Sequence, residues 1–170
     1  MCEVEVKIAF DNGVTPEKRQ EVIEHLNKIL SDEFVLFVKL SKYHWNVRGP
    51  FFGPLHALFQ TLYEQAFKDA DLVAERVRAL GGLSIGTMKE FLGLTRLAEV
   101  PGRNPVDAEM IGDLVNDYQT IIKHLRSDIE KIEKPDPVTA NMLMSVVEQH
   151  EKSAWMLRSH LDCLHGSNKK

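Results

Sequence analysis

The chain has very little cysteine, which excludes a small fold held together by disulfide bonds. Cys2 and Cys163 are the only cysteines among 170 residues, and they lie at opposite ends of the sequence. They form neither a closely spaced metal-binding pair nor a disulfide framework. Such sparse cysteine fits a reducing compartment, so we expect a cytoplasmic protein.

Long hydrophobic runs and excess positive charge are lacking too. No run approaches the roughly 18 apolar residues that cross a membrane, and residues 1–10 lack the basic and apolar segments of an export signal. A net charge of −4 and a pI near 6.0 give no overall attraction for nucleic acid or for an anionic membrane. We therefore expect a soluble protein that binds cations in preference to anions.

Proline and glycine are scarce within long stretches of the chain, and these stretches have the apolar period of helices. Apolar residues recur there at three- and four-residue steps, as one buried helix face requires. Thr15-Pro16 and Asp136-Pro137 are helix start signals. Long helices are predicted over residues 16–47, 54–80, 107–131 and 137–164, and a short one over 88–92.

This pattern predicts an all-α fold, a four-helix bundle with a short extra helix in its long middle connection. That connection allows the third long helix to run parallel to the second. The length and composition favour one domain over residues 1–170, with an N-terminal extension (1–14) and a C-terminal tail (165–170).

The second long helix carries four side chains that can bind metal. His56, Gln60, Asp71 and Glu75 follow one another at separations of four, eleven and four residues. At about 100° per residue they fall within an arc of roughly 100°, so they project from one side of the helix. Gln60 and Asp71 are nevertheless about 16 Å apart along the axis, too far to bind one ion. A single chain therefore carries two half-sites.

Two copies of this helix, packed antiparallel about a two-fold axis, would complete both half-sites. His56 and Gln60 of one copy would then lie level with Glu75 and Asp71 of the other. Two imidazoles and two carboxylates form a ligand set that suits Fe(II), with Zn²⁺ as a competitor. We expect a homo-oligomer with metal sites at its two-fold interfaces.

The same residues carry a resemblance to a known family. They are His44-Trp45-Asn46 with Gly49, then His56, then Asp71 with Glu75-Arg76. Their order and spacing resemble the signature H-W-N-x-x-G…H…D-x-x-x-E-R of the Dps family, the mini-ferritins. The likeness continues through Leu80-Gly81-Gly82, residues 87–91 and Trp155, and it covers most of the chain from about Leu26 onward.

The resemblance implies a ferritin-like bundle with ferroxidase activity. Such a protein binds Fe(II) between subunits, oxidises it, preferably with hydrogen peroxide, and stores Fe(III) in a hollow shell of twelve subunits, which limits oxidative damage. Carried over by position, His44 and His56 of one subunit and Asp71 and Glu75 of its neighbour would be the iron ligands and the catalytic residues. Larger ferritins instead use Glu-x-x-His pairs within one bundle, and no histidine here has a glutamate three residues before it.

Gln60 departs from the family pattern, which has Asp or Glu four residues after the second histidine. A neutral amide is a poorer ligand than a carboxylate and removes one negative charge from each site. Occupancy of the second, weaker iron position is therefore left open.

Two other functions compete with iron oxidation. Some Dps relatives bind nucleoid DNA through flexible basic tails, but this chain begins with Glu3 and Glu5 against Lys7 and ends with only Lys169-Lys170. Because phosphate neutralisation dominates DNA affinity, we expect weak, salt-sensitive binding at most. The third alternative is a structural bundle with a decayed metal site, for which Gln60 is the only evidence.

Several residues also have ordinary structural interpretations. Asp136 is either a carboxylate of an iron-entry pore between subunits or the cap of the last helix. Asp71 and Glu75 by themselves would be a solvated helix face paired with Lys68 and Arg78. Core packing is predicted for Tyr43, Trp45 and Trp155, and a structural role for His25, His124, His150, His160 and His165.

Overall fold

The computed structural model describes residues 11–165, and side chains as far as Leu161. It consists of the helices α1 (Pro16–Asn46), α2 (Phe52–Ala79), α3 (Met88–Leu94), α4 (Asp107–Ile132) and α5 (Pro137–His165), with no strand in the described range. Most of the predicted N-terminal extension, the last five tail residues, Cys2, the Cys163 side chain and Lys169-Lys170 lie outside the described residues.

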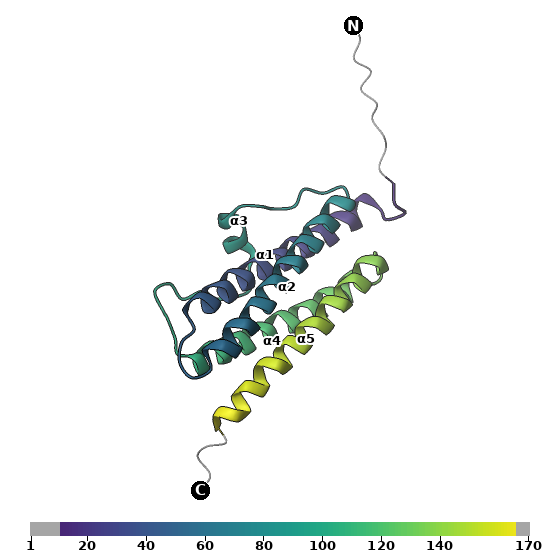
Figure 1. Ribbon diagram of the computed structural model, residues 1–170. Coiled ribbons are helices and arrows are strands. Elements are labelled where there is room, and N and C mark those ends of the chain that lie inside the picture. The colour runs from purple at the N-terminus through teal and green to yellow at the C-terminus, as the bar shows by residue number, and fades with distance from the viewer. Residues whose placement is uncertain (1–10, 166–170) are drawn as a thin grey trace.

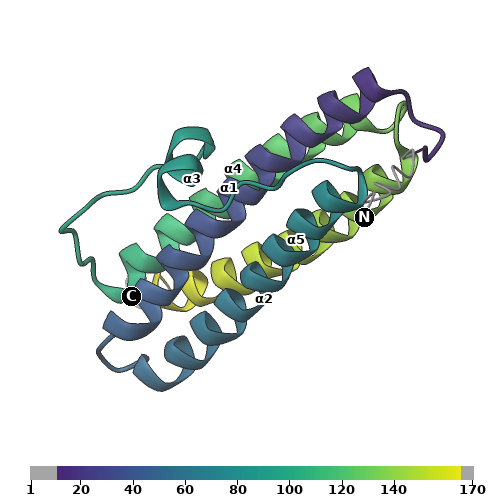
Figure 2. The same ribbon diagram turned by 90° about the horizontal axis from the view of Figure 1, so that it is seen from above.

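Four long helices form the bundle that the sequence predicts. α1 and α2 make one antiparallel hairpin, α4 and α5 make another, and the two hairpins pack side by side (Figure 1). The connection from α2 to α4 runs back along the bundle, and its short helix α3 packs on α1 (Figure 2). As a result α4 runs parallel to α2, as in the ferritin-like arrangement. None of the helices in the described range is both long and apolar enough to span a membrane.

The helix ends follow local rules of capping. Thr15 caps α1 by accepting a hydrogen bond from the backbone N–H of Lys18 at 3.5 Å. Between α1 and α2 the chain reverses through Gly49, whose φ of +111° favours glycine. α2 begins at Phe52, two residues before the predicted start, and Pro54 lies in its first turn. Proline is tolerated there because the first N–H groups of a helix have no partner within it.

A buried ionic network fixes the long connection to the bundle. The Arg96 guanidinium pairs with Asp32 of α1 at 2.6 Å and with Asp128 of α4 at 2.6 Å. Asp32 also accepts hydrogen bonds from the Arg96 backbone and from the Thr95 hydroxyl, and His25 bonds to Asp128. The position of α3 and its flanking loops is therefore determined by paired charges as well as by apolar packing.

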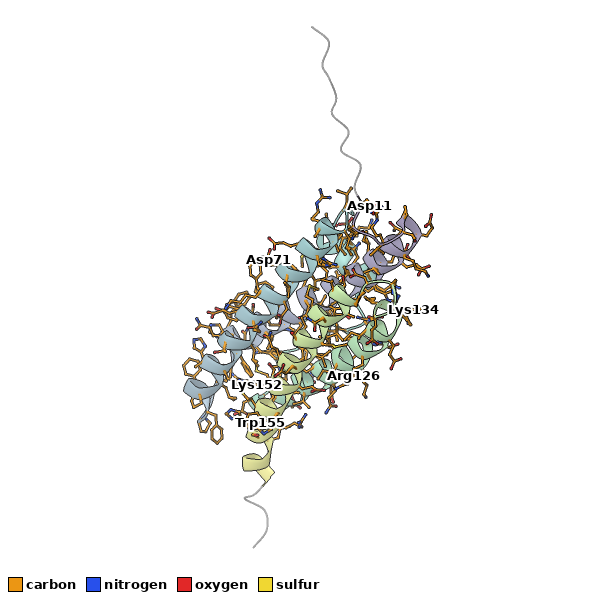
Figure 3. All side chains as sticks on the ribbon, turned by 90° about the vertical axis from the view of Figure 1, so that its right-hand side faces the viewer. Asp11, Asp71, Arg126, Lys134, Lys152 and Trp155 are labelled. Atoms are coloured by element: carbon orange, nitrogen blue, oxygen red, sulfur yellow. The ribbon has the colours of Figure 1, made fainter. Side chains whose placement is uncertain are left out.

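The bundle core contains the expected apolar stripes but neither tryptophan. Tyr43 and Phe59 are buried, whereas Trp45 is 73% exposed and Trp155 is 58% exposed, on the outer side of α5 (Figure 3). The prediction that both tryptophans pack in the core is therefore wrong for the single chain. They lie on helix faces that none of the described residues covers, and large exposed apolar side chains of this kind are common at interfaces.

Candidate metal centre

The turn between α1 and α2 brings His44 and His56 face to face. Their rings are stacked, with centroids 3.8 Å apart and planes inclined by 18°. Phe52 stacks on His56 at 5.0 Å, and the ring of Tyr63 meets His44 edge-on at 5.2 Å. The two imidazoles, twelve residues apart in sequence, are held as a pair by aromatic contacts on both sides.

Reciprocal hydrogen bonds fix the tautomers of this pair. His44 Nδ1 donates to the carbonyl oxygen of His56 at 2.8 Å, and His56 Nδ1 donates to the carbonyl oxygen of His44 at 2.9 Å. Because a carbonyl oxygen only accepts, each Nδ1 carries its proton, and each Nε2 keeps a lone pair. Neither Nε2 has a partner among the described residues. Such outer hydrogen bonds are the usual means of orienting a histidine toward a metal.

Asp71 and Glu75 lie further along α2, and both are exposed. Figure 3 shows Asp71 on the solvent side of this helix. Neither carboxylate makes a hydrogen bond or ion pair with any residue that the structure describes, so the alternative partners Lys68 and Arg78 do not hold them. Arg78 donates instead to the carbonyl oxygen of Gly82. His56 and Asp71 are about 22 Å apart along the helix axis, so the ligands predicted from the sequence cannot bind one ion within a single chain.

The helix face that carries both half-sites is partly apolar. Phe67 is 52% exposed and lies about 20° around the helix from His56, between the imidazole and the carboxylate positions. Phe52, at the start of the same face, is 47% exposed. A surface that alternates metal-binding groups with uncovered aromatic rings is typical of an interface rather than of a solvated helix.

Gln60 lies on this face and is held by its neighbour one turn further on. Its Nε2 donates to Glu64 Oε1 at 2.9 Å. Because this bond occupies the amide nitrogen, the Gln60 side-chain carbonyl oxygen is the atom that remains available to a metal. An amide oxygen is a neutral ligand, so the charge lost relative to a carboxylate is not restored.

Comparison with known proteins identifies the family. The model of the ferritin-like domain matches residues 23–166. The DNA protection during starvation protein 2 of Bacillus anthracis is 36% identical over 144 residues, which are 84% of this chain and 98% of that protein. The chain belongs to the Dps family.

Other relatives agree in sequence, and solved Dps structures agree in fold. A low temperature-induced protein of Nostoc sp. is 44% identical over 152 residues, which are 88% of this chain and 85% of that protein. The crystal structure of a Dps protein from Bacillus brevis superposes with a TM-score of 0.82 at 36% identity, covering 86% of this chain and 99% of that one. DpsC from Streptomyces coelicolor superposes with a TM-score of 0.86 at 27% identity, covering 91% of each chain.

The arginine of the Dps signature has a structural role in this chain. Arg76 reaches from α2 to the start of α5, where its guanidinium pairs with Asp136 at 2.9 Å and donates to Thr139 Oγ1 at 2.7 Å. Asp136 is buried and also accepts hydrogen bonds from the backbone N–H and the hydroxyl of Thr139. Burial raises the pKa of Asp136, but the bonds from Thr139 and Arg76 outweigh it and hold this pKa below its usual range. These contacts support the capping interpretation, and a pore role for Asp136 stays a prediction.

The fold also assembles a second group of metal-binding side chains that sequence spacing does not reveal. Glu33 of α1, Asp69 of α2 and His150 of α5 meet inside the bundle, although 117 residues separate Glu33 from His150. Burial and the nearby Glu33 carboxylate raise the pKa of Asp69 to about 6. The sequence predicted only a structural role for His150. In the structure it lies in the bundle core beside two carboxylates.

Proposed function

We propose that this Dps-family protein is a ferroxidase and iron store whose catalytic sites lie between subunits. Fe(II) is the substrate, and it is held by His44 and His56 of one subunit and by Asp71 and Glu75 of its neighbour. The oxidised iron is stored inside a hollow shell, for which the resemblance to the family implies twelve subunits.

The main support is the contrast between the two half-sites. The imidazole half is organised within one chain, with both Nε2 lone pairs available. The carboxylate half is exposed and unpartnered, on a face where the Phe67 ring is uncovered. Antiparallel pairing of two α2 helices places the complementary halves together and buries the aromatic rings at the same time.

For Fe(II) oxidation by peroxide, the protein has only to position the iron ions and to balance their charge. Two Fe(II) ions give one electron each to a hydrogen peroxide molecule, whose O–O bond breaks to give two hydroxide ions. The two Fe(III) ions take up this hydroxide together with water as they form ferric oxyhydroxide, and four protons are released to solvent. The two carboxylates offset the rising charge on iron as it becomes Fe(III), and the neutral imidazoles add ligands without adding charge. Gln60 contributes no such compensation, so the second iron of each pair is held more weakly than the first.

The relatives named for DNA protection raise a second function. Direct binding through basic tails is disfavoured by the net charge of −4 and by the strong dependence of DNA affinity on cationic contacts. We propose that this chain protects DNA indirectly, by removing the Fe(II) and peroxide that together generate hydroxyl radicals. A gel-shift assay at physiological salt should show no retarded complex, and tight binding there would favour the direct mode.

Stopped-flow measurement of Fe(II) oxidation by peroxide tests the assignment of the site. Asp71→Ala or Glu75→Ala should abolish the fast phase, while helical content remains that of the wild type. Glu148→Ala removes an exposed carboxylate from α5 and should leave the rate unchanged. Wild-type rates in both site variants would show that the site lies elsewhere.

Mixed assemblies test whether the site is shared between chains. A His44→Ala/His56→Ala chain and an Asp71→Ala/Glu75→Ala chain should each be inactive. When they are unfolded together in equal amounts and reassembled, random pairing makes about a quarter of the sites complete. Recovery of about a quarter of the wild-type activity is the expected result, and no recovery in verified mixed shells would refute sharing.

A further inference from the structure

The interior of the bundle contains a compact group of three ionisable side chains, Glu33, Asp69 and His150, here called the core triad. They are 0%, 2% and 2% exposed, and one ligand atom from each lies within 4.8 Å of those from the other two. His150 Nε2 lies 2.7 Å from Glu33 Oε1. The core triad is separate from the interface site: Asp69 and Asp71 are two residues apart, which turns them about 200° from each other around α2.

Two oxygen atoms of the core triad have no partner. Glu33 Oε2 and Asp69 Oδ2 are both buried and accept no hydrogen bond from any described group. Asp69 Oδ1, by contrast, accepts a bond from Gln65 Nε2 at 3.0 Å. Burying a carboxylate oxygen without a donor is unfavourable, so two adjacent cases call for an explanation.

The charges of the core triad are also unbalanced. Glu33 and Asp69 together carry two negative charges when ionised, and His150 supplies at most one positive charge. Tyr118 of α4 meets the His150 ring edge-on at 5.3 Å, and it adds no charge. A divalent cation bound by two carboxylates and a neutral imidazole would make the group neutral, releasing to solvent the proton held between His150 and Glu33.

We propose that the core triad is a metal site within one chain, which takes one divalent transition-metal ion such as Zn(II) or Fe(II). Glu33, Asp69 and His150 are its protein ligands, and Gln65 orients Asp69 through its bond to Oδ1. Two carboxylates and one imidazole form an oxygen and nitrogen set of the kind that these ions accept.

The dimensions of the core triad are compatible with such an ion. Ligand bonds near 2.0–2.2 Å place the ligand atoms of one ion about 3–4 Å apart. All separations within the triad are at most 4.8 Å, so the ligand atoms have to approach one another by no more than about 1 Å, which side-chain torsions on three separate helices can supply. His150 Nε2 and Glu33 Oε1 have to move apart slightly, or the unpartnered Glu33 Oε2 takes the place of Oε1.

Co(II) binding to a chain without the interface site provides the test. A His44→Ala/Asp71→Ala/Glu75→Ala background removes the interface ligands, so the count is independent of the proposed ferroxidase function. After an incubation long enough for local opening of the bundle, equilibrium dialysis and the visible d–d absorption of Co(II) should report about one ion per chain. Adding Asp69→Asn should weaken this binding at least about tenfold.

Matched variants determine where the ion binds. Glu33→Gln should have the same effect as Asp69→Asn. Asp117→Asn should retain the ion, because Asp117 is a buried carboxylate outside the triad that pairs with Lys39 at 2.6 Å. No ion in the background chain, or equal binding in the triad variants, would overturn the proposal.

Crystallography keeps the proposal testable if the triad variants do not fold. Wild-type crystals grown with Zn(II) should show an anomalous peak between the three side chains. Absence of that peak, with zinc bound at other places, would leave the core triad a purely structural cluster.

Discussion

Replacement of Asp136 should destabilise the bundle, because its carboxylate connects α2 to the start of α5. Its carboxylate joins three contacts at the start of α5: the backbone N–H of Thr139, the Thr139 hydroxyl and the Arg76 guanidinium. The Asp136 side chain is only 3% exposed, and Arg76 is 21% exposed. Asp136→Ala removes the helix cap and leaves a partly buried guanidinium without its carboxylate partner, although the bond from Arg76 to Thr139 Oγ1 can remain.

The loss in free energy of unfolding caused by Asp136→Ala can be estimated from these contacts. Loss of an N-cap costs about 1 kcal/mol, and removing one partner of a fully buried pair costs about 3–5 kcal/mol. Since Arg76 keeps some access to water, we expect a total of about 2–4 kcal/mol for Asp136→Ala. At about 2–4 °C per kcal/mol for a chain of this length, the melting temperature should fall by about 5–15 °C. Asp136→Asn keeps a capping oxygen but loses the charge opposite Arg76, so it should cost less than Asp136→Ala.

The dependence of stability on pH distinguishes the contribution of the Asp136 charge from that of its capping hydrogen bond. The folded pKa of Asp136 is lowered, so its ionisation stabilises the fold fully above the unfolded value of about 3.9. This stabilisation is lost as the pH falls through the folded pKa. Melting followed by circular dichroism at fixed protein concentration should therefore show the gap between wild type and Asp136→Asn narrowing below about pH 4.

Glu133 supplies the control, since it is an exposed carboxylate at the same end of the bundle. Glu133→Ala should change the melting temperature by less than about 2 °C. If Asp136→Ala were as stable as Glu133→Ala but slowed iron uptake, the capping assignment would be refuted, and the pore interpretation would gain support.

Three further predictions concern the interface and the packing. Gln60→Glu should tighten the second iron of each site roughly tenfold in anaerobic titrations; two equally tight irons in the wild type would contradict this. Phe67→Glu should dissociate the shell and abolish ferroxidase activity, as measured by light scattering and stopped flow, whereas Met144→Glu, at a similarly exposed site on α5, serves as the comparison. Gly82→Ala places a Cβ 2.8 Å from Ile23 Cδ1 and should cost about 1–2 kcal/mol, while an unchanged melting temperature would mean that Ile23 moves freely.

Sequence periodicity predicted the helices because each has a single buried stripe. The four long helices begin and end within about two residues of their predicted bounds, where proline, glycine and capping side chains act locally. The tryptophans show the limit of this reasoning. Trp45 and Trp155 are large and apolar, yet a stripe pattern cannot tell a residue that faces the core from one that faces a second molecule.

The two groups of proposed metal ligands differ in what the sequence can reveal. Spacing along one helix predicted that His56 and Asp71 share a face, because that relation depends only on helix geometry. The core triad depends on how three helices pack, and no spacing within a helix encodes that packing. The hydrogen bonds between the His44 and His56 side chains and backbones likewise depend on the exact turn at Gly49.

The unequal organisation of the two half-sites has a consequence for assembly. The imidazoles are fixed before any partner arrives, while the carboxylates are solvated and unpaired, so a lone chain should bind iron weakly. Iron that uses both halves binds the paired state more tightly than the lone chain and stabilises it by mass action. By the same linkage, pairing raises the affinity for iron by an equal factor. Iron should therefore slow dissociation of the wild-type interface, and it should not do so after Asp71→Ala, even though the apolar part of the face is unchanged.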